Sequence, residues 1–207
     1  MRYPASRAAY LASLLLLLLL AGCGGGPGSS ALSGRACLAR LDERQVDYRP
    51  LDKIDAAQSW CQVDTAVRVK RTTAGLDKPA TMSCALAARL DQFEREVLQP
   101  LAREELGRRV VRINHLGSFS CRTRNGGGRL SQHALGRAID IAGFRLADGT
   151  TIGVAQDWAG SGANRQFLRH FARRACQYFS VVLTPDSDAD HHDHIHLDIG
   201  PDRKCSV

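Results

Sequence analysis

The sequence predicts an α+β domain, in which a small antiparallel sheet is flanked by helices and fastened by disulfides. Apolar residues recur at helical spacing in the middle of the chain, whereas short alternating runs typical of strands gather towards its end. Helices and strands that are segregated in this way favour an α+β fold over an alternating α/β fold. Because the chain has 207 residues, it has room for one ordinary domain and a short leader.

The N-terminus has the features of an export signal. Arg2 and Arg7 flank the start of an apolar run over residues 8–20, and the sequence Leu-Ala-Gly then leads to Cys23. A basic start, an apolar run and a small-residue exit are typical of a secretory signal, and the run is shorter than the roughly 20 residues of a membrane span. A Cys directly after Leu-Ala-Gly resembles the bacterial lipobox, whose Cys is acylated. An ordinary signal peptide with an incidental Cys is the alternative.

These features divide the chain into three parts. We expect a lipoprotein signal peptide (1–22), a flexible tether that starts at the lipidated Cys23 (23–35), and one globular domain (36–207). Glycine and serine are frequent in the tether, which makes it flexible. The expected location is the cell envelope, with the chain lipid-anchored. In a Gram-negative host, Gly rather than Asp after the Cys favours the periplasmic face of the outer membrane.

The cysteines also indicate export. Without Cys23, six of the seven remain: Cys37, Cys61, Cys84, Cys121, Cys176 and Cys205. An even set in an exported chain predicts three disulfides. None is spaced C-x-x-C, which argues against a cysteine zinc site. Fifteen pairings are possible, and we take the sequential one (37–61, 84–121 and 176–205) as the working hypothesis.

The chain is basic, with 28 Lys and Arg against 21 Asp and Glu and a net charge of +7. Removal of the signal with Arg2 and Arg7 lowers this charge by two, to +5. A basic surface favours anionic polymers. In the envelope these are peptidoglycan and acidic lipid, whereas nucleic acid is a poor partner for an exported lipoprotein. The alternative is that the positive charge only aids solubility.

The clearest helix is expected over residues 79–107. Its apolar side chains follow a spacing of three and four residues: Leu86, Leu90, Phe93, Val97 and Leu101. Thr81 or Ser83 can cap its start. Pro100 lies inside the pattern and should kink or break the helix.

The other expected elements are short. Residues 31–78 have an irregular pattern with no assignable function. The sequence predicts strands at 67–70, 108–116, 136–141, 178–183 and 192–199, a loop at 117–129 and a second helix at 164–176.

The histidines indicate a metal site. Of the seven, His133 lies in the middle of the chain and four lie within 191–196. Residues two apart in a strand point to the same face, so His194 and His196 should lie side by side. Joined by a His and a carboxylate from elsewhere, imidazoles on one face can form a first shell for Zn²⁺. Two His and one Asp leave an open position for water, whose pKa zinc lowers towards about 7.

Here the motifs resemble a known group of enzymes. Their pattern, S-x-H-x-x-G-x-A-x-D followed by H-x-H, is matched by Ser131, His133, Gly136, Ala138, Asp140, His194 and His196. This resembles the LAS zinc peptidases, which include lysostaphin-type enzymes, D-Ala-D-Ala carboxypeptidases and murein endopeptidases. The wider chain, about 37–205, is similar to the bacterial extensin-like C-terminal domain family. The resemblance implies a D-Ala-D-Ala-peptidase-like fold.

The resemblance also implies roles for residues. It makes His133, Asp140 and His196 the ligands of one Zn²⁺, and His194 the neighbouring residue that assists water or the developing oxyanion. Asp193 is the competing general base. In a straight strand it would face away from His194, so it can serve only if the chain bends there. Together with His191, the last two histidines also match an H-x-x-H-x-H form of murein endopeptidases.

Arg122 and Ser131 are the candidate substrate-binding residues. Related enzymes carry an Arg just upstream of the first motif, and a guanidinium offers planar paired donors to a carboxylate or carbonyl oxygen. Arg122 is therefore also a catalytic candidate, and Arg124 is the second candidate for the same role. The alternative is that Arg122 is an ordinary surface residue. Asp198 lies on the face of His196 and can orient its imidazole, or be a solvated edge residue.

Together these points predict a zinc metallopeptidase. We expect a hydrolase that cleaves stem-peptide amide bonds of peptidoglycan (murein), as a D,D-carboxypeptidase or an endopeptidase. The alternative is a non-catalytic envelope lipoprotein that binds peptidoglycan and has a structural zinc site. A zinc carrier fits less well, because carriers favour longer His-rich tracts. We expect a monomer.

Overall fold

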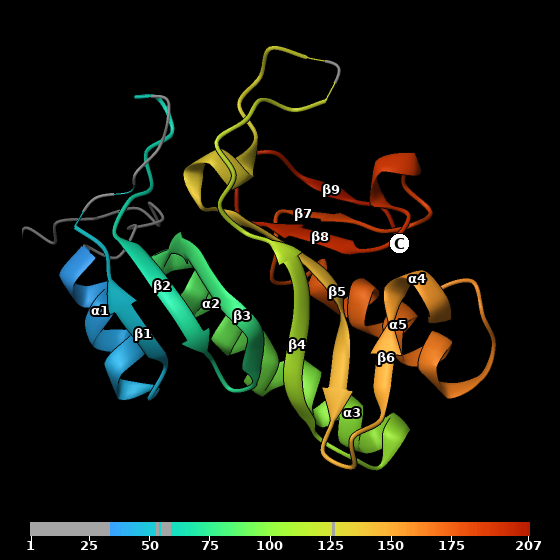
Figure 1. The fold of residues 1–207 in the computed structure, drawn as a ribbon. Helices are drawn as coiled ribbons and strands as arrows, with labels where there is room; N and C mark the ends of the chain where they lie inside the picture. Colours follow the sequence, from blue (N-terminus) through green and yellow to red (C-terminus); the bar gives the residue numbers. More distant parts are fainter. Residues whose placement is uncertain (1–33, 53, 55–58, 126) are drawn as a thin grey trace, which may run out of the picture. The chain divides into compact units, whose positions relative to one another are not determined.

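The computed structural model describes residues 34–52, 54, 59–125 and 127–207 (Figure 1). The predicted signal peptide and the lipidated Cys23 lie outside the described residues, as does most of the tether. Residues 34 and 35 already belong to the first helix, α1 (Gly34–Glu43). No helix among the described residues is long and apolar enough to cross a membrane.

A mixed sheet forms the framework of the domain, with nine strands within the described residues. They are β1 (Asp47–Pro50), β2 (Ala66–Arg71), β3 (Gly75–Ser83), β4 (Val110–Gly117), β5 (Ala138–Leu146), β6 (Thr151–Gly153), β7 (Val181–Leu183), β8 (Ile195–Asp198) and β9 (Lys204–Cys205). Their order is β1-β2-β3-β4-β5-β8-β7-β9, with β6 beside β5. The pairs β3–β4 and β7–β9 are parallel and the other pairs are antiparallel. The predicted α+β class is thus confirmed, whereas the expected small antiparallel sheet is larger and contains two parallel pairs.

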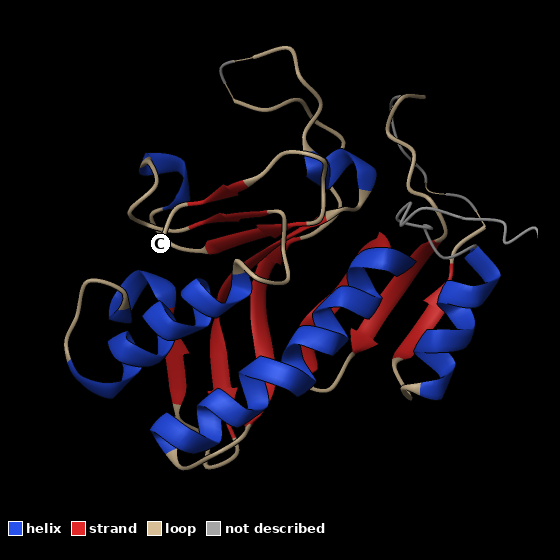
Figure 2. Ribbon diagram, turned by 180° about the vertical axis from the view of Figure 1, so that it is seen from behind, coloured by secondary structure: helices blue, strands red, loops and turns tan. Residues whose placement is uncertain are grey.

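The longer helices cover one face of this sheet, as the view from behind shows (Figure 2). They are α1, α2 (Cys84–Phe93), α3 (Gln99–Leu106) and α5 (Gly162–Ala175), and a short helix, α4 (Val154–Asp157), follows β6. Between helices and sheet lies a core of buried apolar residues. Phe93 is its centre, with the rings of Phe171, Tyr178 and Phe179 within 5.2–5.4 Å of its own. No helix of the described residues lies on the other face of β1–β6 (Figure 1).

The expectation of an irregular start was wrong, because residues 34–83 contain α1 and three strands. Cys37 and Leu41, four residues apart, are the buried residues of α1, which is too few for a clear helical pattern. Strand β1 is almost fully exposed and therefore lacks alternation. The predicted strand at 67–70 is confirmed as β2.

The predicted central helix begins later than expected. Residues 79–81 belong to β3, and the helix starts at Cys84. Ser83 has extended backbone angles, and its hydroxyl accepts the N–H of Leu86 (3.2 Å), so of the two proposed caps Ser83 is confirmed.

The prediction that Pro100 breaks the helix was wrong, because the backbone stays helical from Cys84 to Leu106. A π-helical turn, η1 (Glu94–Leu98), separates α2 from α3, and Pro100 lies in the first turn of α3. Proline has no N–H and its ring clashes with the carbonyl one turn earlier, so a wider turn at this place removes the conflict. Gly107, at φ +67°, ends α3 in the left-handed conformation.

Three disulfides fasten the domain, as predicted. The bond Cys176–Cys205 confirms one proposed pair, whereas the other two proposed pairs, 37–61 and 84–121, are wrong. Cys37 is bonded to Cys84, which joins α1 to the start of α2. Cys61 is bonded to Cys121, which ties the loop after β4 to the segment before β2. Neighbours in space rather than in sequence therefore determine the pairing.

The remaining predictions place most elements correctly and their ends less well. The strand at 108–116 is β4, that at 136–141 is the first half of β5, and the helix at 164–176 is α5. The last two strands are shorter than predicted. In particular, β8 begins only at Ile195, so residues 192–194 lie in a turn.

Candidate metal centre

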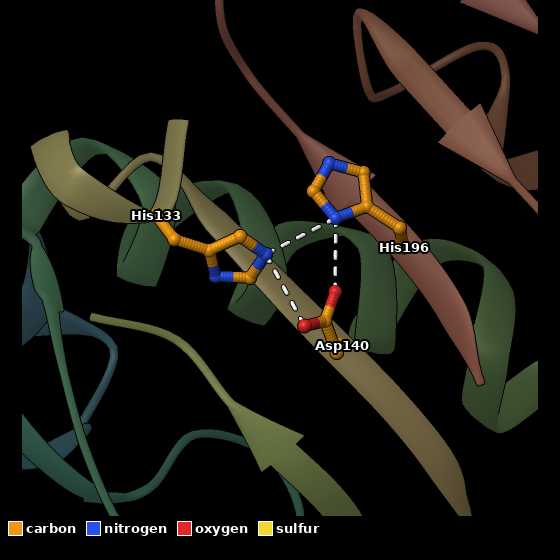
Figure 3. A group of neighbouring side chains, drawn as sticks. All are labelled: His133, Asp140 and His196. Atoms are coloured by element: carbon orange, nitrogen blue, oxygen red, sulfur yellow. Dashed lines mark hydrogen bonds and ion pairs between the residues drawn. The ribbon is translucent and has the colours of Figure 1, made fainter. Parts of the chain in front are cut away.

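Three elements bring together His133, Asp140 and His196 (Figure 3). His133 lies in the 3₁₀ turn η2 (Gln132–Leu135) just before β5. Asp140 lies on β5 and pairs directly with His196 on the antiparallel strand β8. Directly opposite residues of an antiparallel pair project to the same face, so the sheet register itself places the carboxylate beside the second imidazole.

The distances suit a shared cation. His133 Nε2 is 3.2 Å from His196 Nδ1 and 3.2 Å from Asp140 Oδ2. His196 Nδ1 is 2.9 Å from Asp140 Oδ1. One ligand atom from each of the three residues lies within 4.8 Å of the other two. Two imidazole nitrogens and a carboxylate oxygen are a donor set that Zn²⁺ accepts, so the residues present fit the metal.

The remaining ring nitrogens fix how both imidazoles point. His133 Nδ1 lies 2.6 Å from the carbonyl oxygen of Ser118. His196 Nε2 lies 3.2 Å from Asp198 Oδ2. An N–H donated to an oxygen on one side leaves the lone pair of the other nitrogen facing the centre, which is the usual support of a metal-ligating His. His133 would thus bind through Nε2 and His196 through Nδ1.

The charges of the group also favour a cation. Burial alone would raise the pKa of Asp140, but hydrogen bonds and positive charge from His133 and His196 lower that pKa far below its usual range. Burial lowers the pKa of His196, yet the carboxylates of Asp140 and Asp198 outweigh burial and raise it to about 9. The carboxylates therefore stabilise positive charge at this point, whether a proton or a metal ion carries it.

A family model, the extensin-like protein C-terminus, matches residues 35–206 of the chain. The chain belongs to this family. No curated protein and no solved structure matches it. For this extensin-like chain, similarity to the LAS peptidases therefore remains a prediction from the two motifs.

Two residues of the first motif, Ser131 and Gly136, have structural roles in this extensin-like domain. Ser131 caps the turn η2, and its buried hydroxyl accepts the N–H of His133 (3.3 Å). Gly136 ends the turn at φ +60°, and a Cβ there would meet the backbone nitrogen of Ser83 at 2.9 Å. Both residues thus position His133. The predicted contact of Ser131 with substrate stays a prediction.

His194 lies at the edge of the triad. Its Nε2 is 3.5 Å from Asp140 Oδ1, and its Nδ1 is 2.8 Å from Asp193 Oδ1. Because both residues precede β8, the chain bends there, and the Asp193 carboxylate reaches the imidazole instead of facing away. His194 lines the cleft at the triad, whereas Asp193 is not among the described residues that line it. The imidazole of His194 is therefore nearer to the triad than the Asp193 carboxylate is.

The triad lies in a cleft of about 650 Å³, and the described residues that line it include five Arg or Lys side chains and five Asp carboxylates. Arg122 is exposed on the rim of this cleft, so the structure does place it at the site. Arg124 also lines the cleft, but its guanidinium is paired with Asp202 (2.7 Å). The disulfide at Cys121 anchors the residue directly before Arg122.

Sequence reasoning missed several groups around the centre. The carbonyl oxygen of Ser118 carries no side-chain signal that could identify it. Asp188, whose carboxylate lies 2.6 Å from His191 Nδ1, looks like turn material in the sequence. The ring of His191 lies 5.1 Å from that of His194 and 5.9 Å from that of His196. His191 itself was not missed, because the H-x-x-H-x-H spacing had already indicated it.

Proposed function

We propose that this chain is a zinc-dependent peptidase that hydrolyses stem-peptide amide bonds of peptidoglycan. The observation that carries the proposal is the meeting of two imidazoles and a carboxylate from three separate elements, with ligand atoms within 4.8 Å of one another. The second nitrogen of each imidazole is held by an oxygen. Three protein ligands in an open cleft are typical of catalytic rather than structural zinc sites.

The ligand residues would hold the ion at the floor of the cleft. Zinc supplies Lewis acidity there, which polarises a carbonyl oxygen and makes water nucleophilic near neutral pH. His133 Nε2, His196 Nδ1 and the Asp140 carboxylate are the three donors. Asp198 and the carbonyl of Ser118 keep the two rings in the required orientation.

His194 would move the proton of the reaction. Its Nδ1 is held by Asp193 at 2.8 Å, which directs Nε2 towards Asp140 and the cleft. As the oxygen of water bonds to the scissile carbonyl carbon, Nε2 takes the proton that this water loses. When the C–N bond breaks, the same nitrogen gives the proton to the leaving amine. Asp193 acts through His194 and is thus a positioning residue.

Arg122 would bind the substrate rather than move protons. Its exposed guanidinium on the rim can donate two parallel hydrogen bonds to a carboxylate of the stem peptide or to the scissile carbonyl oxygen. Peptidoglycan is a substrate that carries carboxylates close to its amide bonds. The export-type N-terminus and the three disulfides support a location in the cell envelope, where this polymer is found.

The test is digestion of purified muropeptides by the zinc-loaded protein, with products identified by mass spectrometry. We expect cleavage by the parent protein and a loss of at least about 100-fold in His194→Ala. His192→Ala is the matched control, because His192 is exposed and does not line the cleft. Its Nε2 lies 3.8 Å from Asp193 Oδ2, but an exposed pair at this distance contributes little, so this variant should retain most of the activity. Binding to sacculi without cleavage of any bond, at pH values from mild acid to mild base, would instead favour a non-catalytic peptidoglycan-binding lipoprotein.

A further inference from the structure

The helix-free face of the sheet carries arginines in directly opposed pairs. Arg49 on β1 pairs with Arg68 on β2, and Arg112 on β4 pairs with Arg145 on β5. Directly opposed residues share a face, with Cβ atoms about 5 Å apart. The apolar neighbours of these arginines (Val67, Val69, Ile113 and Phe144) are buried in the core instead. Because side chains alternate along a strand, the four arginines lie on the opposite face, away from the core.

In the part of the chain that the structure describes, these cations have no partner of opposite charge. Within the described residues, none of the four arginines forms an ion pair, and the side chain of Arg68 makes one hydrogen bond, to the hydroxyl of Thr81 (3.2 Å). Asp77 of β3 is exposed next to them, and its Oδ1 already accepts the N–H of His115 (3.2 Å). Like charges directly opposite one another destabilise a sheet. An anionic ligand bound between these arginines would therefore reduce their mutual repulsion.

The metal centre lies on the same face. Ile139 and Ile141 of β5 pack into the core, so Asp140 between them projects to the helix-free side. Asp140 and Arg145 are five residues apart, which in a regular strand would place them on opposite faces. An irregularity in the β4–β5 register, around Gly143, reverses the alternation and keeps both on one face. About 16 Å of extended strand separates them.

We propose that this cationic face, defined by Arg49, Arg68, Arg112 and Arg145, is a docking surface for the carboxylate-bearing peptidoglycan polymer whose peptides enter the cleft. The proposal rests on the function proposed above and adds to it how a polymeric substrate is held. A guanidinium binds carboxylates with paired hydrogen bonds. Because the cations are spread over several strands of the face that holds the triad, they suit an extended polyanion better than a small ligand. Arg122 on the rim of the cleft continues the positive charge towards the metal centre.

The test is binding of the full chain to insoluble sacculi at low salt, measured in EDTA so that nothing is cut. The double variant Arg112→Gln/Arg145→Gln should bind about tenfold more weakly, since each exposed charge contributes modestly. Arg103→Gln/Arg173→Gln, on the helices α3 and α5, removes the same charge from exposed positions elsewhere and should bind like the parent. Blocking the carboxylates of the sacculi as amides should abolish the difference between the two double variants.

Two results would overturn the proposal. One is equal weakening by both double variants, which would mean that only net charge matters. The other is a larger loss of binding to acidic phospholipid vesicles than to sacculi, which would assign the face to a membrane. Because the assay excludes cleavage, a failure here leaves the muropeptide digestion unaffected. Equally, the absence of cleavage there does not alter the comparison of the two variants.

Discussion

Glu94 is a carboxyl group buried in the π-helical turn between α2 and α3, and it should make the stability of this domain depend on pH. Its side chain is fully buried. Burial raises its pKa from 4.5 to about 8, although hydrogen bonds from the hydroxyl of Thr72 and the N–H of Ala74 (2.6 Å) act in the opposite direction. The folded protein therefore keeps this proton over a range in which the unfolded chain has lost it.

The sign and the size of the effect follow from this difference. Between pH 4.5 and about 8 the folded state binds more protons than the unfolded state, so stability is complete below pH 4.5 and falls as pH rises towards 8. Each pH unit within this window costs at most about 1.4 kcal/mol. The total is about 5 kcal/mol, of which about 3 to 4 kcal/mol is lost between pH 5 and pH 8.

Glu94→Gln isolates this contribution, because the amide has nearly the same shape and cannot ionise. Urea unfolding in EDTA, followed by circular dichroism, gives the free energy of unfolding of both proteins at pH 5, 6, 7 and 8. The parent should lose about 3 to 4 kcal/mol relative to the variant across this range. Parallel curves for the two proteins would show that the Glu94 carboxyl is not held neutral in the folded state, and would refute the reasoning.

Three further outcomes are expected. Asp198→Asn should weaken zinc binding, measured by calorimetry, about 10- to 100-fold, because the ring of His196 loses its charged partner. An unchanged zinc affinity would show that Asp198 does not support His196 as a ligand. Phe93→Ala should lower the free energy of unfolding by about 3–5 kcal/mol, since the centre of the aromatic cluster is removed; a urea-derived loss below about 1 kcal/mol would contradict it. Replacing both Cys37 and Cys84 by Ser should cost about 2–5 kcal/mol, because the closed loop of 47 residues is opened; an unchanged melting temperature would count against it.

The parts of the fold that were predictable are those with a strong repeating pattern. The helix around Phe93 and the amphipathic α5 bury one face each, and their spacing makes this visible in the sequence. The exposed edge strand β1 has no such alternation. The disulfide partners of Cys37 and Cys61 depend on which elements meet in space, and spacing along the chain does not contain that information.

The candidate site was partly predictable for a similar reason. The juxtaposition of His133, Asp140 and His196 was expected from two short motifs, and the structure does bring the three side chains together. The relation of Asp193 to His194 was not predictable, because it depends on where β8 begins. The opposed arginines of the cationic face follow from strand register, which the sequence does not specify.

The central claim is that His133, Asp140 and His196 hold one zinc ion, and the zinc content of the purified protein tests it most directly. After loading with zinc and removal of the excess, elemental analysis should find one zinc ion per chain in the parent protein and in the control His192→Ala. It should find little or none in Asp140→Ala and His196→Ala, provided that circular dichroism shows both variants to be folded. A parent protein free of zinc, or triad variants that keep the full amount, would contradict the claim.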